Sequence, residues 1–345
     1  MKIINANAEL LNPNGLHPYK FMERVGRICY KSEDKITDES AVKFIRALAK
    51  NRHTAMLEHA HLYLSMDKNL LTEIENELNT DATLANTTGT TPVRNYFNIT
   101  NDNDIRIISG SFRAFISLFE IPSLRNKLCF LNLRNVLSDR YPEVFDALTN
   151  DELDSIYNEP TINLYDRTEF KAWIEANYAV DRNAIFNKHL THTILFTCDR
   201  GVTHEFVRHR PASFAQESTR YCNYGNDKFG NEITVIEPCF WNKEIQPDTY
   251  DINATKAYNA WYKACKASEK AYFEILNNNG TPQQARDVLP TSVKTEIVIT
   301  TTESEWQHII NLRLHGTTGS PHPQMVEVMK IAYPFLKEES DGRLH

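Results

Sequence analysis

The sequence has no apolar run long enough to cross a membrane, and its first residues lack the apolar core and cleavage site of a secretion signal. No two of its six cysteines form a C-x-x-C pair, so nothing supports a zinc ribbon or a thioredoxin-like site. Basic residues are not in excess: 38 Lys and Arg stand against 45 Asp and Glu, a net charge of -7. This balance argues against a general nucleic-acid binder. We expect a cytoplasmic protein with free thiols and with no membrane or nucleic-acid partner.

Two common phosphate-binding fingerprints are also missing. No G-x-G-x-x-G follows a predicted strand, and no G-x-x-x-x-G-K-[ST] occurs anywhere in the chain. His53, His59 and His61 invite a metal interpretation, but their spacing matches neither H-E-x-x-H nor H-x-x-E-H, so we expect no metal. Any phosphate site must therefore be built from other residues.

What the sequence does contain is a mixture of strand and helix patterns without regular alternation. Hydrophobic residues make up 41% of the chain, which is enough for a sizeable core. Residues 59–66 alternate between polar and apolar and predict a strand. Short helical patterns separated by acidic loops at 120–180 predict a small helical insertion. We expect an α+β fold, with a mixed or antiparallel sheet and helices packed on it.

One predicted strand and helix frame the most polar part of the chain. Residues 190–198 read as a strand, after which Thr203 is expected to cap a short helix. Pro211 cannot continue a helix and should end it. A loop is expected to follow over 213–220.

Further toward the C-terminus, the longest predicted helix covers 252–278, and a strand is predicted at 293–300. Two capping boxes predict helix starts, one formed by Thr281 with Gln284 and the other by Thr302 with Glu305. The two helices that they open carry Arg286 and Arg313. Both arginines are therefore on ordered elements.

Residues 203–221 concentrate positive charge in an otherwise acidic chain. The stretch contains two histidines and three arginines, Arg208, Arg210 and Arg220. Arginine offers a planar fork of donors that suits phosphate, and Ser218 adds a hydroxyl, so the stretch predicts a site for a phosphorylated small molecule. Gln216 is a candidate for contact with a base edge or a ribose. The alternative is that the arginines are solvated or pair with Asp199, Glu205 and Glu217.

The same stretch resembles a family signature. Arg208-His209-Arg210, seven residues and then Ser218 are similar to the R-H-R-x7-S signature of the flavin-dependent thymidylate synthases, and the flanks Thr203–Glu205 and Gln216–Tyr221 resemble common family forms. Other family-like segments follow in the family's order: Arg27–Tyr30, His53 with Glu58-His59, Ser109-Gly110 with Arg113, Arg286–Pro290, and Asn311–Arg313 with His322–Met325. This resemblance implies one family-like domain over 1–345, lengthened by insertions at about 67–104 and 120–180.

The resemblance implies an enzyme that methylates dUMP to dTMP for nucleotide biosynthesis. Members of this family bind FAD, take a hydride from NADPH and use methylenetetrahydrofolate as the one-carbon donor. No cysteine of the enzyme attacks the uracil ring. Members are homotetramers in which each active site is shared between subunits, so a homotetramer is implied here as well.

The resemblance also implies roles for particular residues. Arg313 is the implied catalytic residue, in contact with the pyrimidine, where a fixed cation favours the ionised ring nitrogen N3. The implied dUMP contacts are Glu205 (from a neighbouring subunit), Arg208, Gln216, Glu217, Ser218, Thr219, Arg220, Arg286 and Arg313. The implied FAD contacts are Glu58, Arg208, His209, Arg210, Gln216, Thr302, Ser304, His308 and His322.

The chain departs from the family at several FAD positions. Ala55 stands where members have a hydroxyl residue, and Thr302, Ser304 and His308 stand where some members have Asn, Arg and Asn. The flavin is therefore expected to be held differently, while the nucleotide residues are unaffected. Two other interpretations remain: a non-enzymatic homologue that senses flavin or nucleotide, and an RNA-binding protein, against which the net charge counts.

Overall fold

The computed structural model describes all residues except 89–90, 103–104, 157–160, 221, 227–228 and 242–251. The chain forms two compact units: unit 1 comprises 1–11, 26–33 and 192–345, and unit 2 comprises 12–25 and 34–191. Helices and mostly antiparallel strands occur in both, which confirms the α+β class. The prediction of a single domain over the whole chain stays a prediction.

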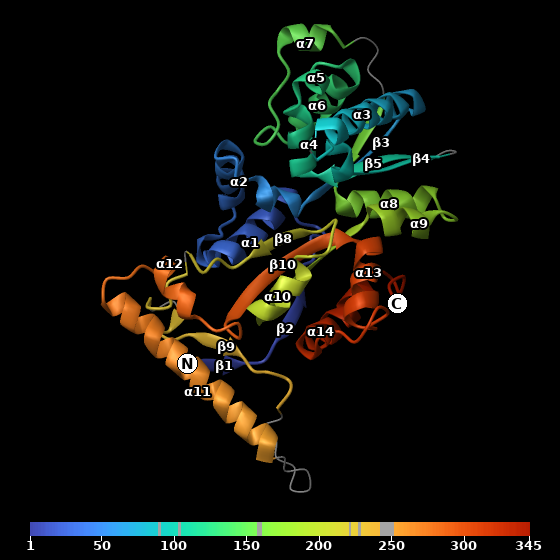
Figure 1. Cartoon of the computed structure of the whole chain (residues 1–345). Helices are drawn as coiled ribbons and strands as arrows, with labels where there is room; N and C mark the ends of the chain where they lie inside the picture. The colour runs from blue at the N-terminus through green and yellow to red at the C-terminus, as the bar shows by residue number, and fades with distance from the viewer. Residues whose placement is uncertain (89–90, 103–104, 157–160, 221, 227–228, 242–251) are drawn as a thin grey trace. The chain divides into compact units, whose positions relative to one another are not determined.

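The main sheet of unit 1 has the strand order β2-β7-β10-β8 (Figure 1). Its strands are β2 (Asn7–Leu10), β7 (Thr191–Asp199), β8 (Ser213–Gln216) and β10 (Lys294–Thr302). β2 pairs antiparallel with β7, and β10 pairs antiparallel with β8, with Ile297 opposite Gln216. The predicted strands at 190–198 and 293–300 are confirmed. Of the loop expected over 213–220, residues 213–216 instead form β8, because β10 pairs their backbone groups, while 217–220 are a loop as predicted.

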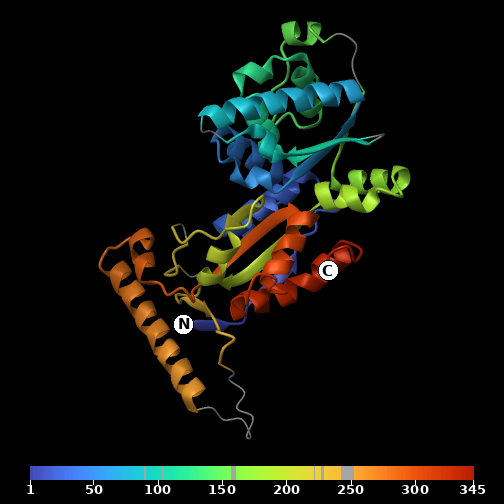
Figure 2. The same ribbon diagram turned by 45° about the vertical axis from the view of Figure 1, so that its right-hand side comes forward.

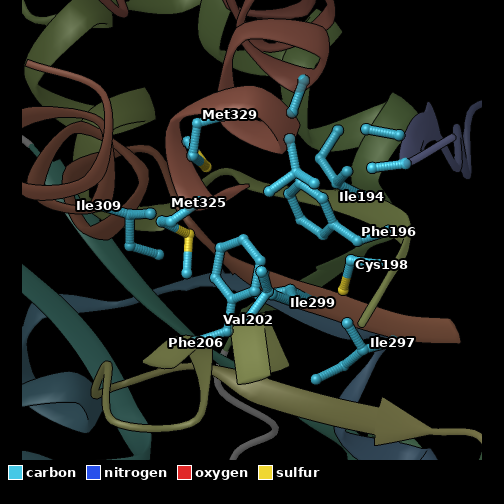
Figure 3. Packing of buried hydrophobic residues seen from close by; sticks show 14 of the residues in the cluster. Ile194, Phe196, Cys198, Val202, Phe206, Ile297, Ile299, Ile309, Met325 and Met329 are labelled. Atoms are coloured by element: carbon cyan, nitrogen blue, oxygen red, sulfur yellow. The ribbon is translucent and has the colours of Figure 1, made fainter. Parts of the chain in front are cut away.

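Three helices cover this sheet and form the core of unit 1: α10 (Arg200–Phe206), α13 (Glu303–Arg313) and α14 (Pro323–Glu339). In Figures 1 and 2 the orange-red α13 and α14 lie beside the yellow-green α10. Figure 3 shows Val202 and Phe206 of α10 packed with Phe196, Ile299 and Met325. The rings of Phe196 and Phe206 are 4.6 Å apart. Because these side chains are fully buried, the polar residues of α10 and α13 are held at fixed positions.

A second cluster of unit 1 forms around the two-stranded parallel sheet β1 (Lys2–Ile4) and β9 (Thr234–Ile236). The long helix α11 (Ile252–Asn277) packs on it through Cys265 and Tyr272. Its bounds are close to the predicted 252–278. The short α12 (Pro282–Ala285) begins with the predicted capping box of Thr281 and Gln284, which is confirmed. A 3₁₀ turn, η5 (Arg286–Val288), follows it, so Arg286 caps α12 rather than lying inside it.

Unit 2 is built on the antiparallel sheet β4-β5-β3-β6, with β3 (His61–Met66), β4 (Phe97–Asp102), β5 (Ile105–Ser111) and β6 (Ile162–Tyr165). Its helices are α2 (Ser40–Lys50), α3 (Lys68–Thr88), α4 (Phe112–Phe119), α5 (Pro122–Arg125), α6 (Leu128–Arg140), α7 (Asn150–Asp154), α8 (Arg167–Asn177) and α9 (Arg182–His189), with 3₁₀ turns η2 (Thr54–Glu58) and η3 (Val93–Tyr96). The remaining elements, α1 (Pro18–Tyr30) and η1 (Glu33–Lys35), contain residues of both units.

The described residues of the two expected insertions, 67–104 and 120–180, lie in unit 2. The 120–180 segment is mainly helical, as predicted, but it also supplies β6, which pairs with β3 through Leu164 opposite Leu64. Four residues are too few for a clear alternation of polar and apolar side chains, so the sequence did not predict β6. The predicted strand at 59–66 is confirmed as β3. No helix in the described residues is long and apolar enough to span a membrane.

Candidate functional site

Helix α10 and the segment that follows it supply the first group of site residues. Asp199, not Thr203 as predicted, caps α10: its Oδ1 accepts a hydrogen bond of 2.8 Å from the Val202 N–H. The helix therefore begins at Arg200, and its last turn presents Glu205. Gln324 Nε2 donates to Asp199 Oδ2 at 2.7 Å and ties α14 to the same cap. Burial raises the pKa of Asp199, although these bonds oppose the rise.

The centre of the site is Arg313, at the end of α13. Its Nε donates to Nε2 of His209 at 3.1 Å, its Nη1 donates to the carboxylate of Glu205 at 2.7 Å, and its Nη2 donates to the Glu205 carbonyl at 3.4 Å. An arginine has five N–H donors, so two remain available on the terminal nitrogens. Three residues that the sequence predicted separately are thus brought together from α10, α13 and the segment between α10 and β8.

Helix α13 begins with Thr302, whose hydroxyl accepts from the Glu305 N–H at 3.4 Å and contacts the Ser304 hydroxyl at 3.0 Å. Thr302 is the helix cap as predicted, but only this half of the predicted capping box forms. One turn later His308 is exposed, and its ring lies 5.9 Å from that of His209. Of the three predicted positions, Thr302 and Ser304 therefore lie at the start of the helix, and His308, at its middle, lies beside His209.

A metal interpretation arises from two side chains of α13 and the neighbouring His209. Ligand atoms of His209, Glu305 and His308 all lie within 4.8 Å of one another. Neutral imidazoles and a carboxylate are donors that Zn²⁺ accepts. However, the positively charged Arg313 contacts the same imidazole of His209, and a positive charge at that distance opposes a second cation. The absence of a metal stays a prediction.

The arginines of the signature face solvent. Arg208, Arg210 and Arg220 are exposed, and the Arg210 guanidinium lies 5.5 Å from the Phe214 ring while its Nη1 donates to the Val207 and His209 carbonyls. Among the described residues, Arg208 and Arg210 have no ion-pair partner. The alternative in which these two pair with nearby carboxylates is therefore wrong in this structure.

Hydrogen bonds from neighbouring side chains fix the end of β8 and the loop that follows it. Gln216 Nε2 donates to Thr203 Oγ1 at 3.1 Å and to Thr295 Oγ1 at 3.3 Å, so its amide is engaged within the unit. Arg200 donates to the Glu217 carbonyl at 3.0 Å. Ser218, half-buried beside Thr219, accepts from the Arg220 N–H at 3.3 Å. The bend at 218–220 therefore has a fixed backbone.

Glu217 is buried and belongs to an ionic network behind this loop. Lys294 Nζ lies 3.0 Å from Glu217 Oε2 and also binds Glu296, which Lys31 binds from the other side. Burial lowers the pKa of Lys294, but the carboxylates of Glu217 and Glu296 outweigh it and the pKa lies above its ordinary value. Because its carboxylate is already paired, Glu217 can contribute to a ligand site mainly through its backbone.

Two cysteines adjoin the same loop. The Cys29 thiol donates to the Gln216 carbonyl at 2.7 Å. Burial raises the pKa of Cys29 to about 11 and that of Cys222 to about 12, so both are thiols at neutral pH. A thiol is a poor nucleophile compared with a thiolate, which agrees with the expectation that no cysteine attacks the substrate.

Three further predicted residues make their described contacts outside the cluster of Arg313, His209 and Glu205. Glu58 lies in unit 2, where it pairs with Arg113. Arg286 is exposed at the end of α12 beside Asp287. His322 caps α14, with its ring 5.4 Å from that of Phe240. Tyr221, part of the family-like segment, lies outside the described residues. The assigned ligand roles of all predicted site residues stay predictions.

The sequence analysis missed two residues that the structure places at the site. Glu305 was read only as half of a capping box, and Lys294 only as part of a strand. A signal for Lys294 was present, because Lys294 and Glu296 are two residues apart on the predicted strand and therefore share one face, where opposite charges can pair. No local signal exists for Glu305, whose nearest partner, His209, is distant in sequence.

Comparison with known proteins shows which family the chain belongs to. The model of a family described as thymidylate synthase complementing protein matches residues 150–337, more than half of the chain. Similar curated proteins named flavin-dependent thymidylate synthase include those of Pyrococcus furiosus (30% identical) and Pyrococcus abyssi (31%), each aligned over 41% of this chain and 50% of the relative. That of Mycobacterium avium is 27% identical over 51% of this chain and 72% of the relative. The match thus spans about half the length of the two Pyrococcus relatives.

Proposed function

Because the chain belongs to the thymidylate synthase complementing protein family, we propose that it is a flavin-dependent thymidylate synthase. It methylates dUMP to dTMP with methylenetetrahydrofolate as the one-carbon donor and NADPH as the reductant, and so supplies thymidylate by de novo synthesis. The observation that carries this proposal is the Arg313 guanidinium, anchored by His209 and Glu205 with two N–H donors left over. It stands among exposed arginines suited to phosphate groups.

The residues of the site fit FAD. The exposed guanidinium groups of Arg208 and Arg210 offer donors for a pyrophosphate, and arginine forks match phosphate oxygens well. His209, Thr302, Ser304 and His308 would hold the rest of the cofactor at the start of α13. When bound, the flavin supplies the hydride-transfer chemistry, while the protein supplies position and electrostatics.

The bend at 218–220 fits the phosphate of dUMP. Ser218 offers a hydroxyl, Arg220 is exposed beside it, and the backbone is fixed by the contacts of Gln216 and Glu217. A preorganised loop loses little conformational entropy when it binds an anion. Arg286 would add a further cation, and Glu205 would contact the nucleotide in a site shared between subunits of a homotetramer.

Arg313 has a defined electrostatic task in this proposal. Its guanidinium stays charged at any working pH, and a fixed cation lowers the pKa of an adjacent acidic group. Placed against the pyrimidine, it favours the ionised N3 and therefore a more electron-rich ring. Glu205 balances part of that charge, since it lies 2.7 Å from Arg313 Nη1. We also propose a cytoplasmic setting, which six unpaired cysteines support.

The test is the visible absorption spectrum of the purified protein before and after anaerobic addition of NADPH. An oxidised flavin band that bleaches with NADPH, followed by dTMP formation once dUMP and methylenetetrahydrofolate are added, is the expected result. A protein that contains no flavin and takes up no added FAD would refute the proposal. Retained dUMP binding without turnover would instead favour a non-enzymatic nucleotide sensor.

A further inference from the structure

Glu305 is a buried carboxylate at the site with no assigned task. Its backbone N–H completes the start of α13 by donating to Thr302, so the side chain is not used for capping. The atom Oε1 is buried and has no hydrogen-bond partner among the described residues. It lies 3.7 Å from Nδ1 of His209. A buried carboxylate oxygen without a hydrogen-bond partner is unfavourable, and the group nearest to it in the structure is the His209 imidazole.

The hydrogen bond from Arg313 fixes which nitrogen of His209 carries the proton. Arginine can only donate, so Nε2 of His209, at 3.1 Å from Arg313 Nε, must be the unprotonated nitrogen. In a neutral imidazole the proton then lies on Nδ1, which faces Glu305. The four side chains form one chain of contacts, in the order Glu305, His209, Arg313 and Glu205.

We propose that Glu305 is a positioning residue for the nucleotide. The inference rests on the proposed function and deepens it. Glu305 attracts the Nδ1–H of His209 and so keeps Nε2 free to accept from Arg313. His209 and Glu205 then hold the guanidinium through three of its five N–H donors, and one N–H on each terminal nitrogen has no acceptor among the described residues. Without Glu305 the imidazole can change tautomer and present a donor to the donor of Arg313.

This assignment excludes a metal on the same side chains. A cation bound to Nδ1 of His209 would displace the proton to Nε2, where it would meet the N–H of Arg313. In this proposal Glu305 keeps the proton of His209 on Nδ1, and the cluster of His209, Glu305 and His308 binds no metal ion. The two interpretations differ in the expected effect of added Zn²⁺: a metal site binds it, whereas the positioning role predicts no binding at these side chains.

The experiment measures the Kd for dUMP of the FAD-loaded protein by calorimetry, first for the wild type. A wild type that binds FAD but no dUMP would overturn the proposed function, and the present inference with it. Given wild-type binding, we expect Glu305→Ala to weaken dUMP binding about tenfold. We expect Glu305→Gln, which keeps an oxygen acceptor of the same size, to stay within about threefold. Gln307→Ala, on another face of α13, is the matched control and should bind as the wild type does.

A double-mutant cycle separates positioning from general loss of structure. In an Arg313→Lys background, Glu305→Ala should weaken dUMP binding by less than about twofold, because its effect passes through the guanidinium. Equal losses for the Ala and Gln variants, or an unchanged tenfold effect in the Arg313→Lys background, would refute the positioning role. Binding of one equivalent of Zn²⁺ by the wild type, lost in Glu305→Gln, would do the same.

Discussion

Lys294 is the centre of the buried ionic network behind the 216–220 loop, and its replacement tests how much that network stabilises unit 1. Methionine keeps the apolar stem of the side chain and removes only the charge. Glu217 would then remain as a carboxylate with only 2% of its side chain exposed and without its cation. Glu296 would keep Lys31, so one of the two carboxylates stays paired.

The expected loss follows from this geometry. Removing one partner of a buried ion pair costs about 3–5 kcal/mol, because the other charge is left buried. Lys294 keeps 17% exposure, which lets water reach the site and places the effect at the lower end. We expect Lys294→Met to lower the free energy of unfolding by about 3 kcal/mol. Urea unfolding followed by tryptophan fluorescence measures it from the midpoint and slope.

A second substitution provides the control. Adding Glu217→Gln to Lys294→Met removes the stranded charge, and we expect it to restore at least about half of the lost stability, since a neutral amide is far less costly to bury. The reasoning fails if Lys294→Met unfolds within about 1 kcal/mol of the wild type. It also fails if the double variant is no more stable than the single one.

Three further predictions concern catalysis and pH. Arg313→Ala should slow thymidylate formation by at least about 10²-fold in a protein that still unfolds cooperatively in urea, because it removes a preorganised cation from the site; an active variant would exclude Arg313 from the mechanism. Cys222→Ser should turn over at near the wild-type rate, since burial raises the pKa of this thiol to about 12; a folded but inactive variant would reopen covalent catalysis. Hydrogen bonds from Arg134 lower the pKa of Glu152 from 4.5 to about 2, so the stability that this pair contributes is complete above 4.5 and is lost as pH falls toward 2. Between pH 5 and pH 3 the free energy of unfolding, measured in urea, should fall less for Glu152→Gln than for the wild type. Equal decreases in the two proteins would contradict this assignment.

The sequence alone determined those features that depend on neighbours within a few residues. The strand at 191–199, the long helix α11, the capping box at Thr281 and the cap at Thr302 all follow from local spacing and capping chemistry. The concentration of arginines at 208–220 and the family resemblance are also local patterns. Together these features gave the fold class, the family and most of the candidate residues.

Only the tertiary structure decided how those residues are paired. Arg313 meets His209 across 104 residues and Glu205 across 108, and Lys294 meets Glu217 across 77. Such contacts depend on packing of α10 and α13 against one sheet, which no local pattern encodes. The same reason explains the local errors. Asp199 caps α10 in place of Thr203 because Gln324 of a distant helix fixes its carboxylate, and residues 213–216 form a strand because β10 provides their hydrogen-bond partners.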